Sequence, residues 1–226
     1  MWYDKRETWI IKLKILNKEI TKLKLLQKWL KTKDLYINVT FMLHMSQINY
    51  NIKIVEVLLK SENHIRRLAR LIGTNQTTIA RKVHDLYKEN IIDFKQEGKN
   101  KVFYIKKTLE ARQYVNFVET YKLLETLKRY PRLRRIIEQI KKNQKISLAI
   151  LFGSYAKGTA SKESDIDIYI DTTDNKIKEE VELIDSKISV KIGNYNKDSL
   201  LIKEIEKAHT IIKGVELYYE KNKLFD

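Results

Sequence analysis

Two aspartates separated by one residue are the most chemically suggestive feature of the sequence. Asp165 and Asp167 alternate with Ile166, Ile168 and Ile170, which is the period of a strand that buries one of its faces. This alternation predicts that both carboxylates project from the opposite face, close to one another. Neighbouring carboxylates repel unless a cation lies between them, and Mg²⁺ commonly takes one or two protein carboxylates together with water and substrate phosphates. We therefore predict a divalent-ion site at Asp165 and Asp167, with Mn²⁺ as an alternative to Mg²⁺.

A small polar turn upstream offers the groups that a phosphate needs. The apolar run of residues 145–152 predicts a buried strand that ends at Gly153 and Ser154. Gly153 allows close approach of the backbone, Ser154 offers a hydroxyl and an N–H, and residues 155–157 are expected to open a short helix whose positive end attracts an anion. Together with Lys157 they are the predicted nucleotide-binding residues, for ATP or another nucleoside triphosphate. The alternative is a surface turn before a solvent-exposed acidic strand edge.

These residues resemble the minimal nucleotidyltransferases of the DNA polymerase β superfamily, whose signature is Gly-Ser, a fixed gap and Asp-x-Asp. Gly153, Ser154, Asp165 and Asp167 match it, including the ten-residue gap. The resemblance implies transfer of a nucleoside monophosphate, expected to be AMP, from a triphosphate to an acceptor hydroxyl with release of pyrophosphate. It also implies that both aspartates are catalytic and hold metal ions, while Gly153 and Ser154 bind the phosphates. Some relatives modify antibiotics and others are antitoxins that modify a toxin on tyrosine, and the sequence does not select an acceptor.

One group of the family's site is missing from the sequence. Many active members carry a third carboxylate on the strand that follows the helix after the signature. Here that strand is expected at residues 187–193, where Ser189 and Lys191 face the same way as the expected acid. The resemblance therefore implies nucleotide binding, with transfer that is slow or absent unless a partner supplies the missing group. The alternative is a catalytically weak or inactive regulator, or an antitoxin-like protein, that senses nucleotide or binds a partner.

Positive charge is concentrated in one part of the chain. The 226 residues carry a formal net charge of +16. Residues 1–144 contain 32 Lys and Arg against 14 Asp and Glu, whereas residues 145–226 contain 13 against 15. This asymmetry favours a polyanion-binding part attached to a small catalytic part. The alternative is a composition that is rich in lysine on every solvated face.

Residues 46–107 show the pattern of three helices followed by a hairpin. A turn at residues 73–75 separates the second and third helices, where Gly73 suits a C-cap and Thr74 or Asn75 suits an N-cap. The order resembles the winged helix-turn-helix domains, which implies contact with duplex DNA; the alternative is a winged helix used for protein contact alone. The candidate DNA-binding residues are polar and basic, namely Asn75, Gln76, Thr77, Thr78, Arg81 and Lys82 in the third helix and Lys99 and Lys101 in the hairpin.

The remaining segments complete an α+β organisation in four parts. Residues 1–45 form a basic amphipathic pattern, expected to pack on the body; self-pairing, membrane contact and a natural start at Met42 or Met45 are the alternatives. Residues 108–144 predict a connector of two helices divided at Tyr130-Pro131, which is also a candidate homodimer contact. Residues 145–226 predict the nucleotidyltransferase domain, a mixed sheet with helices that ends in a short strand at Val215–Tyr219.

Composition excludes several other classes of protein. The chain has no cysteine, which removes disulfides and thiolate metal sites and fits a reducing cytoplasm. Lysines interrupt every apolar run that would otherwise span a bilayer, so we expect a soluble cytoplasmic protein without membrane contact. The four histidines are scattered without the spacing of metal ligands.

Overall fold

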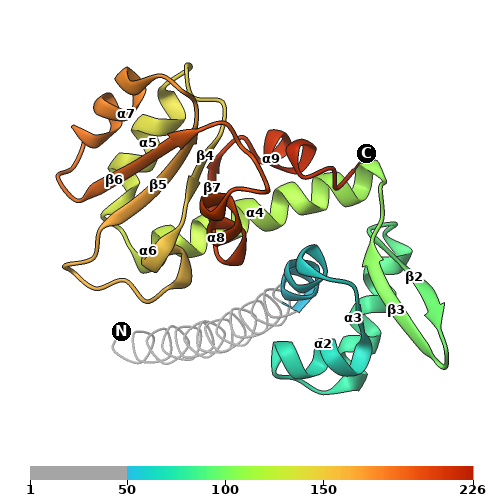
Figure 1. Ribbon diagram of the computed structural model, residues 1–226. Coiled ribbons are helices and arrows are strands. Elements are labelled where there is room, and N and C mark those ends of the chain that lie inside the picture. Colours follow the sequence, from blue (N-terminus) through green and yellow to red (C-terminus); the bar gives the residue numbers. More distant parts are fainter. Residues whose placement is uncertain (1–49, 226) are drawn as a thin grey trace, which may run out of the picture. The chain divides into compact units, whose positions relative to one another are not determined.

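The computed structural model describes residues 50–225, which form an α+β fold (Figure 1). Residues 52–226 group into one compact unit. The predicted amphipathic helix in residues 1–45 lies outside the described residues. Within the described part of the chain, no helix combines the length and the apolar character needed to cross a membrane.

The first part of the described chain has the three helices and the hairpin that the sequence predicted. Its three strands pair antiparallel in the order β1-β3-β2. In chain order the elements are a helix at residues 50–60, β1 (Asn63–His64), α2 (Ile65–Ile72), α3 (Gln76–Lys88), β2 (Ile92–Glu97) and β3 (Asn100–Ile105). Most of the buried residues beneath them are apolar, Asn63 and Lys82 being the exceptions; the apolar ones include Ile52, Val55, Leu68, Ile79, Leu86 and Phe103.

The turn between α2 and α3 has the predicted caps. Gly73 adopts a left-handed conformation with φ 75°, and its N–H donates to the carbonyl of Ala69 at 3.0 Å. Asn75 begins α3, because its side-chain oxygen accepts a hydrogen bond from the Thr78 N–H at 2.7 Å. These two contacts satisfy backbone groups that a helix leaves unpaired at its ends, and they fix the angle at which α3 leaves the turn.

Two helices follow, as the sequence predicted, on either side of Pro131. They are α4 (Leu109–Arg129) and α5 (Leu133–Lys142). Thr108 caps α4 and also donates its hydroxyl to the carbonyl of Asn90 at 2.7 Å, which ties the start of α4 to the end of the helix-turn-helix. The 21-residue α4 then continues to the second sheet, where Leu123 enters the core.

The second sheet is mixed, as expected. Its order is β6-β5-β4-β7, with β5 and β6 parallel and the other neighbours antiparallel. The elements are β4 (Ala149–Leu151), α6 (Gly153–Lys157), β5 (Ile166–Asp171), α7 (Asn175–Glu182), β6 (Ile188–Gly193), α8 (Leu200–Lys207), β7 (Thr210–Lys213) and α9 (Val215–Lys221).

The two faces of this sheet have different environments. Ile166, Ile168 and Ile170 of β5 pack into a core that also contains α5 and α7. Because side chains alternate along a strand, Asp167 and Tyr169 project from the other face. The sequence had grouped α5 with the connector, but its four buried residues belong to the core of this sheet.

The predicted strand at Val215–Tyr219 is wrong. The last strand is β7, and the residues after it form α9. Gly214 explains the change, because its φ of 83° ends the strand and a Cβ at this position would overlap the carbonyl oxygen of Ser147. Val215, Tyr218 and Tyr219 then follow the three- and four-residue spacing of a helix face, and both tyrosines are buried.

Candidate functional site

Asp167 lies on the face of β5 that is turned away from the isoleucine core. It is half-buried, while Asp165 precedes the strand by one residue and is exposed. Burial raises the pKa of Asp167, and the negative charge of Asp165 raises it further, whereas Lys191 and Lys157 oppose the shift. The structure therefore brings both predicted metal ligands together with two lysines that the folded chain places nearby.

Gly153 lies directly against Asp167. It follows β4 and opens α6 with a φ of 66°, a conformation that side chains other than glycine rarely adopt. A Cβ on Gly153 would overlap Oδ2 of Asp167 and would lie 3.0 Å from its Cγ. The Phe152 N–H donates to the backbone carbonyl of Asp167 at 3.0 Å, which holds the two segments together. The predicted phosphate turn and the predicted metal ligand are thus neighbours, because the missing side chain at residue 153 leaves room for the Asp167 carboxylate.

Lys157 and Ser154 occupy the rest of α6. Lys157 is about half exposed and forms an ion pair with Glu204 of α8, with Nζ and Oε1 3.1 Å apart. Exposed ion pairs of this kind contribute little net stability, so Lys157 is able to exchange this partner for a phosphate. The backbone carbonyl of Ser154 accepts from the Thr159 N–H at 3.0 Å, which closes the end of the helix.

The parallel pairing of β5 and β6 decides what faces Asp167. Asp167 is opposite Ser189, and Tyr169 is opposite Lys191. The predicted orientation of Ser189 and Lys191 is therefore confirmed, and neither is a carboxylate. Among residues 50–225, no group of three or more His, Cys, Asp or Glu side chains is placed to hold a metal ion. Two carboxylates fit an ion that takes the rest of its shell from water and substrate, as Mg²⁺ does.

Tyr130 is a positioning residue that the sequence did not reveal. Its hydroxyl accepts a hydrogen bond from the N–H of Ala160 at 3.2 Å, and its ring packs edge-on against Tyr155 of α6 with centroids 4.8 Å apart. These contacts anchor the loop that joins α6 to β5, and hence the gap between the two halves of the signature. A tyrosine before a proline carries no sequence signal for such a role.

The candidate DNA-binding residues lie on α3 and on the hairpin. Gln76, Thr77 and Arg81 are exposed near the start of α3, while Asn75 uses its side chain to cap the helix. Lys99 and Lys101 are exposed on the hairpin, and the ammonium of Lys101 lies 4.0 Å from the centroid of the Phe94 ring.

Lys82 is a correction to the sequence-based prediction. It was expected on the exposed face of α3, but it is 5% exposed and its ammonium pairs with Asp85 at 3.3 Å. The reason is its place on the helix, beside Val83 and one turn from Ile79 and Leu86, all of which are buried. A lysine there covers apolar surface with its stem instead of presenting its charge to a ligand.

Several solved structures are similar to part of this chain. The transcriptional repressor BigR from Xylella fastidiosa shares 18% identity over 39% of this chain and 90% of its own, with a TM-score of 0.30. The homodimeric winged helix-turn-helix DNA-binding domain (fragment 1–100) of a possible ArsR-family transcriptional regulator from Mycobacterium bovis shares 12% identity over 40% of this chain and 86% of its own, also with a TM-score of 0.30. No curated protein matches the chain. Residues 134–223, which contain Gly153, Ser154, Asp165 and Asp167 and begin within α5, match the family model of the polymerase beta nucleotidyltransferases.

Proposed function

We propose that the chain binds a nucleoside triphosphate with a divalent ion and transfers a nucleoside monophosphate, AMP in our proposal, to an acceptor hydroxyl. The observation that carries the proposal is the contact between Gly153 and Asp167, where only a glycine leaves room beside the carboxylate. The family match over residues 134–223 supports the same class of reaction. Pyrophosphate is the leaving group, and the acceptor oxygen forms the new bond to the α-phosphorus.

Each residue of the site has a distinct role in this proposal. Asp165 and Asp167 would hold Mg²⁺ or Mn²⁺, which when bound neutralises phosphate charge. Gly153 admits the phosphates close to the backbone of α6, and the Ser154 hydroxyl donates to a phosphate oxygen. Lys157 leaves Glu204 and supplies a positive charge to the same phosphates.

A second function is favoured by the residues of β6 that share a face with Asp167. Ser189, opposite Asp167, and Lys191, opposite Tyr169, lie where many active members of the resembled family carry an acid. Burial and Asp165 raise the pKa of Asp167 and the charge of Lys191 opposes that rise, so a cation is present where a further carboxylate would bind metal. In this alternative the chain is a regulator, or an antitoxin-like protein, that binds nucleotide without efficient transfer.

We further propose that the winged helix binds duplex DNA in the cytoplasm. The exposed residues Gln76, Thr77 and Arg81 of α3 are of the types that reach base edges and phosphates, and Lys99 and Lys101 are exposed on the hairpin. Leu109, Phe117 and Leu124 on α4 are 70%, 46% and 51% exposed, which supports a homodimer through this helix.

The experiment is a transfer assay on the full chain with ATP labelled at the α-phosphate, Mg²⁺ or Mn²⁺, and a cell extract as the source of acceptor. Label on a protein or small molecule, lost in the Asp165→Asn, Asp167→Asn variant, supports transfer. Calorimetry of ATP with and without the ion is run on the same samples. Ion-dependent binding without transfer supports the regulator, and absence of ion-dependent binding overturns both functions.

A further inference from the structure

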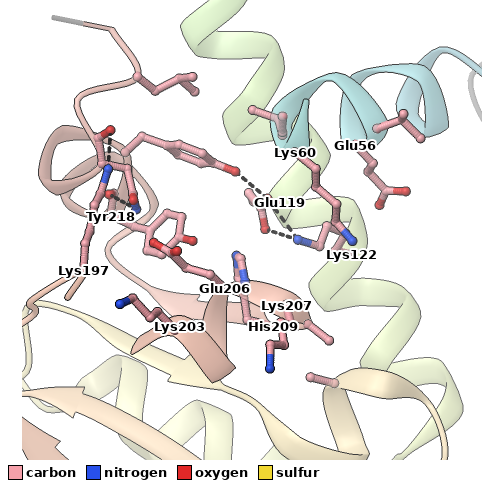
Figure 2. A pocket seen from close by; sticks show the side chains of 17 residues that line it. Glu56, Lys60, Glu119, Lys122, Lys197, Lys203, Glu206, Lys207, His209 and Tyr218 are labelled. Carbon is pink, nitrogen blue, oxygen red and sulfur yellow. Dashed lines mark hydrogen bonds and ion pairs between the residues drawn. The ribbon is translucent and has the colours of Figure 1, made fainter. Parts of the chain in front are cut away.

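A cavity lies apart from the candidate nucleotide site. Its volume is about 810 Å³, within the range of small-molecule sites (Figure 2). It is lined by the helix at residues 50–60, by α4, by α8 and by α9, and it touches α6 only at Ala156. None of Gly153, Asp165 and Asp167 lines it.

The lining carries an excess of positive charge. It contains five lysines against three glutamates. Lys122 is paired with Glu119, and Lys207 is paired with Glu204. Lys60 and Lys203, which come from the helix at residues 50–60 and from α8, have no ion-pair partner within the described part of the chain, and Figure 2 shows both among the side chains around the cavity.

A buried polar network forms one wall. Glu119 is 1% exposed and accepts hydrogen bonds from Lys122 at 2.9 Å and from the hydroxyl of Tyr219 at 2.7 Å. The two donors compensate the buried negative charge of Glu119. Because Glu119 is already engaged by them, it does not compete with a ligand for Lys60 and Lys203.

His209 adds an acceptor without a partner. Its Nδ1 lies 3.0 Å from the carbonyl of Ile205, while its Nε2 is buried and has no hydrogen-bond partner. Burial, followed by the charge of Lys122, lowers the pKa of His209 to about 4, so the ring is neutral at pH 7. A neutral ring whose Nδ1 donates to a carbonyl has Nε2 as its acceptor. The wall therefore contains one unpaired acceptor, which is itself buried, and its ring adds no positive charge to that of the lysines.

We propose that this cavity binds a small phosphate ester of about mononucleotide size, at a site separate from Asp165 and Asp167. Lys60 and Lys203 supply point charges for the phosphate. Tyr218 and Tyr219 contribute the edges of their buried rings to the lining. This proposal does not rest on nucleotidyl transfer, since no residue of the transfer site takes part.

A ligand in this cavity would stabilise the folded chain. The ligand would contact the helix that precedes the helix-turn-helix and also α8 of the second sheet, so it binds the folded chain and not the unfolded one. Such a ligand stabilises the folded chain by RT ln(1 + L/Kd), where L is the free ligand concentration, so the melting temperature rises with the logarithm of that concentration once it exceeds Kd. The same site would give the chain a means to respond to a metabolite without chemistry.

The test is calorimetry of AMP with the full chain in the presence of EDTA, which removes divalent ions. Pyrophosphate and inorganic phosphate are the further probes. The Lys60→Gln, Lys203→Gln variant is compared with Lys141→Gln, Lys176→Gln, which removes the same charge from exposed lysines outside the cavity. We expect metal-free AMP binding that weakens about tenfold or more in the cavity variant and changes less than about twofold in the control.

The variant Asp165→Asn, Asp167→Asn separates this site from the transfer site. Metal-free binding that survives in this variant supports the cavity, whatever the outcome for Mg²⁺-dependent ATP binding. Binding lost in it places the ligand at the transfer site and overturns the proposal. The absence of binding by all three probes overturns it as well, as does an equal loss in the cavity variant and its charge-matched control.

Discussion

Gly153 is the residue whose replacement tests the candidate site most directly. Its backbone is left-handed, and its missing side chain leaves room for the carboxylate of Asp167. Gly153→Ala should lower the free energy of unfolding by about 1–2 kcal/mol from the backbone alone. It should also displace Asp167 and weaken Mg²⁺-dependent ATP binding about tenfold or more. Denaturant unfolding and calorimetry measure the two effects.

Gly98 is the matched control for this change. It also has a positive φ, 58°, but no atom lies within 4 Å of its Cβ position. Gly98→Ala should therefore show the stability loss without the loss of ATP binding. If both variants bind ATP as the unmodified protein does, Gly153 does not shape the site in the way we infer.

The pKa of Asp167 predicts a change in stability with pH. Burial first, and then Asp165, raises this pKa above the ordinary value of 3.8. A raised carboxyl pKa means that ionisation opposes folding, so the loss of stability is present above the native pKa and disappears as pH falls through it. Asp167→Asn removes the charge and should give a small rise in melting temperature at pH 7, which vanishes at acidic pH.

A surface aspartate controls for the removal of charge as such. Asp198 is exposed in the loop before α8, and Asp198→Asn should leave the melting temperature unchanged across the same pH series. A fall in melting temperature for Asp167→Asn at pH 7 would contradict the prediction. It would mean that the ionised carboxylate is stabilised by its two lysines more than burial and Asp165 oppose it.

At the scale of the elements, the register of β5 and β6 predicts how to restore a complete acidic site. Ser189 is directly opposite Asp167, so Ser189→Asp adds a carboxylate on the same face. We expect transfer in the labelled-ATP assay to rise about tenfold or more, because a further ligand completes the metal site. Ser189→Asn, which has the same shape without the charge, should not raise it. Rapid transfer by the unmodified protein, reduced by Ser189→Asp, would show that a third acid is not needed.

The exposed and buried basic residues of α3 give opposite predictions for DNA binding. Arg81 is exposed, so Arg81→Ala should weaken binding and reduce the slope of affinity against salt by about one counterion. Lys82 is buried, so Lys82→Met should leave the salt slope unchanged. Fluorescence anisotropy on a labelled duplex over a salt series measures both. An equal loss of slope in the two variants would mean that Lys82 leaves its buried position when DNA binds.

The elements that the sequence predicted are those with local signals. The turn at Gly73 and Asn75 has both caps in adjacent residues, and β5 has an unbroken alternation. The strand predicted at Val215–Tyr219 is wrong because a short, mostly apolar run fits a strand or a helix equally well. The contact between Gly214 and Ser147, which ends the strand before this run, is a tertiary one. The exposed position predicted for Lys82 is wrong, because the residue lies on the buried face of α3 with Ile79, Val83 and Leu86.

For the candidate site too, the sequence predicts only what has a signal along the chain. The signature residues have a fixed spacing, so the sequence could predict that Gly153 and Asp167 act together, and their contact agrees. The charge-rich cavity had no such signal, because its lysines and His209 come from segments between residues 56 and 224. Their proximity is a product of the tertiary fold, and no periodicity along the chain encodes it.

For the whole molecule, α4 joins the two regions that we assign to DNA and to nucleotide. Its first turn is tied to Asn90 through Thr108, and near its other end Leu123 lies in the core of the second sheet. A continuous helix of 21 residues is a stiff link compared with a loop. We therefore expect binding of Mg²⁺-ATP and binding of DNA to influence one another through α4. Such coupling is reciprocal by thermodynamic linkage: if Mg²⁺-ATP changes the affinity for DNA by some factor, DNA changes the affinity for ATP by the same factor.

The last prediction concerns the chain without its first 44 residues. Residues 52–226 group into one compact unit, and the buried residues of the helix at 50–60 begin at Ile52. A protein starting at Met45 should therefore be soluble and unfold in a single cooperative transition, followed by circular dichroism.

Residues 1–44 carry ten Lys and Arg against four Asp and Glu, so most of the positive charge before residue 145 remains. Salt-dependent binding of duplex DNA should remain with it, since the proposed contacts lie on α3 and the hairpin. Insolubility, or melting without cooperativity, would show that residues 1–44 complete the hydrophobic core. Loss of DNA binding in a shortened protein that still melts cooperatively would instead place the polyanion contact in the removed segment.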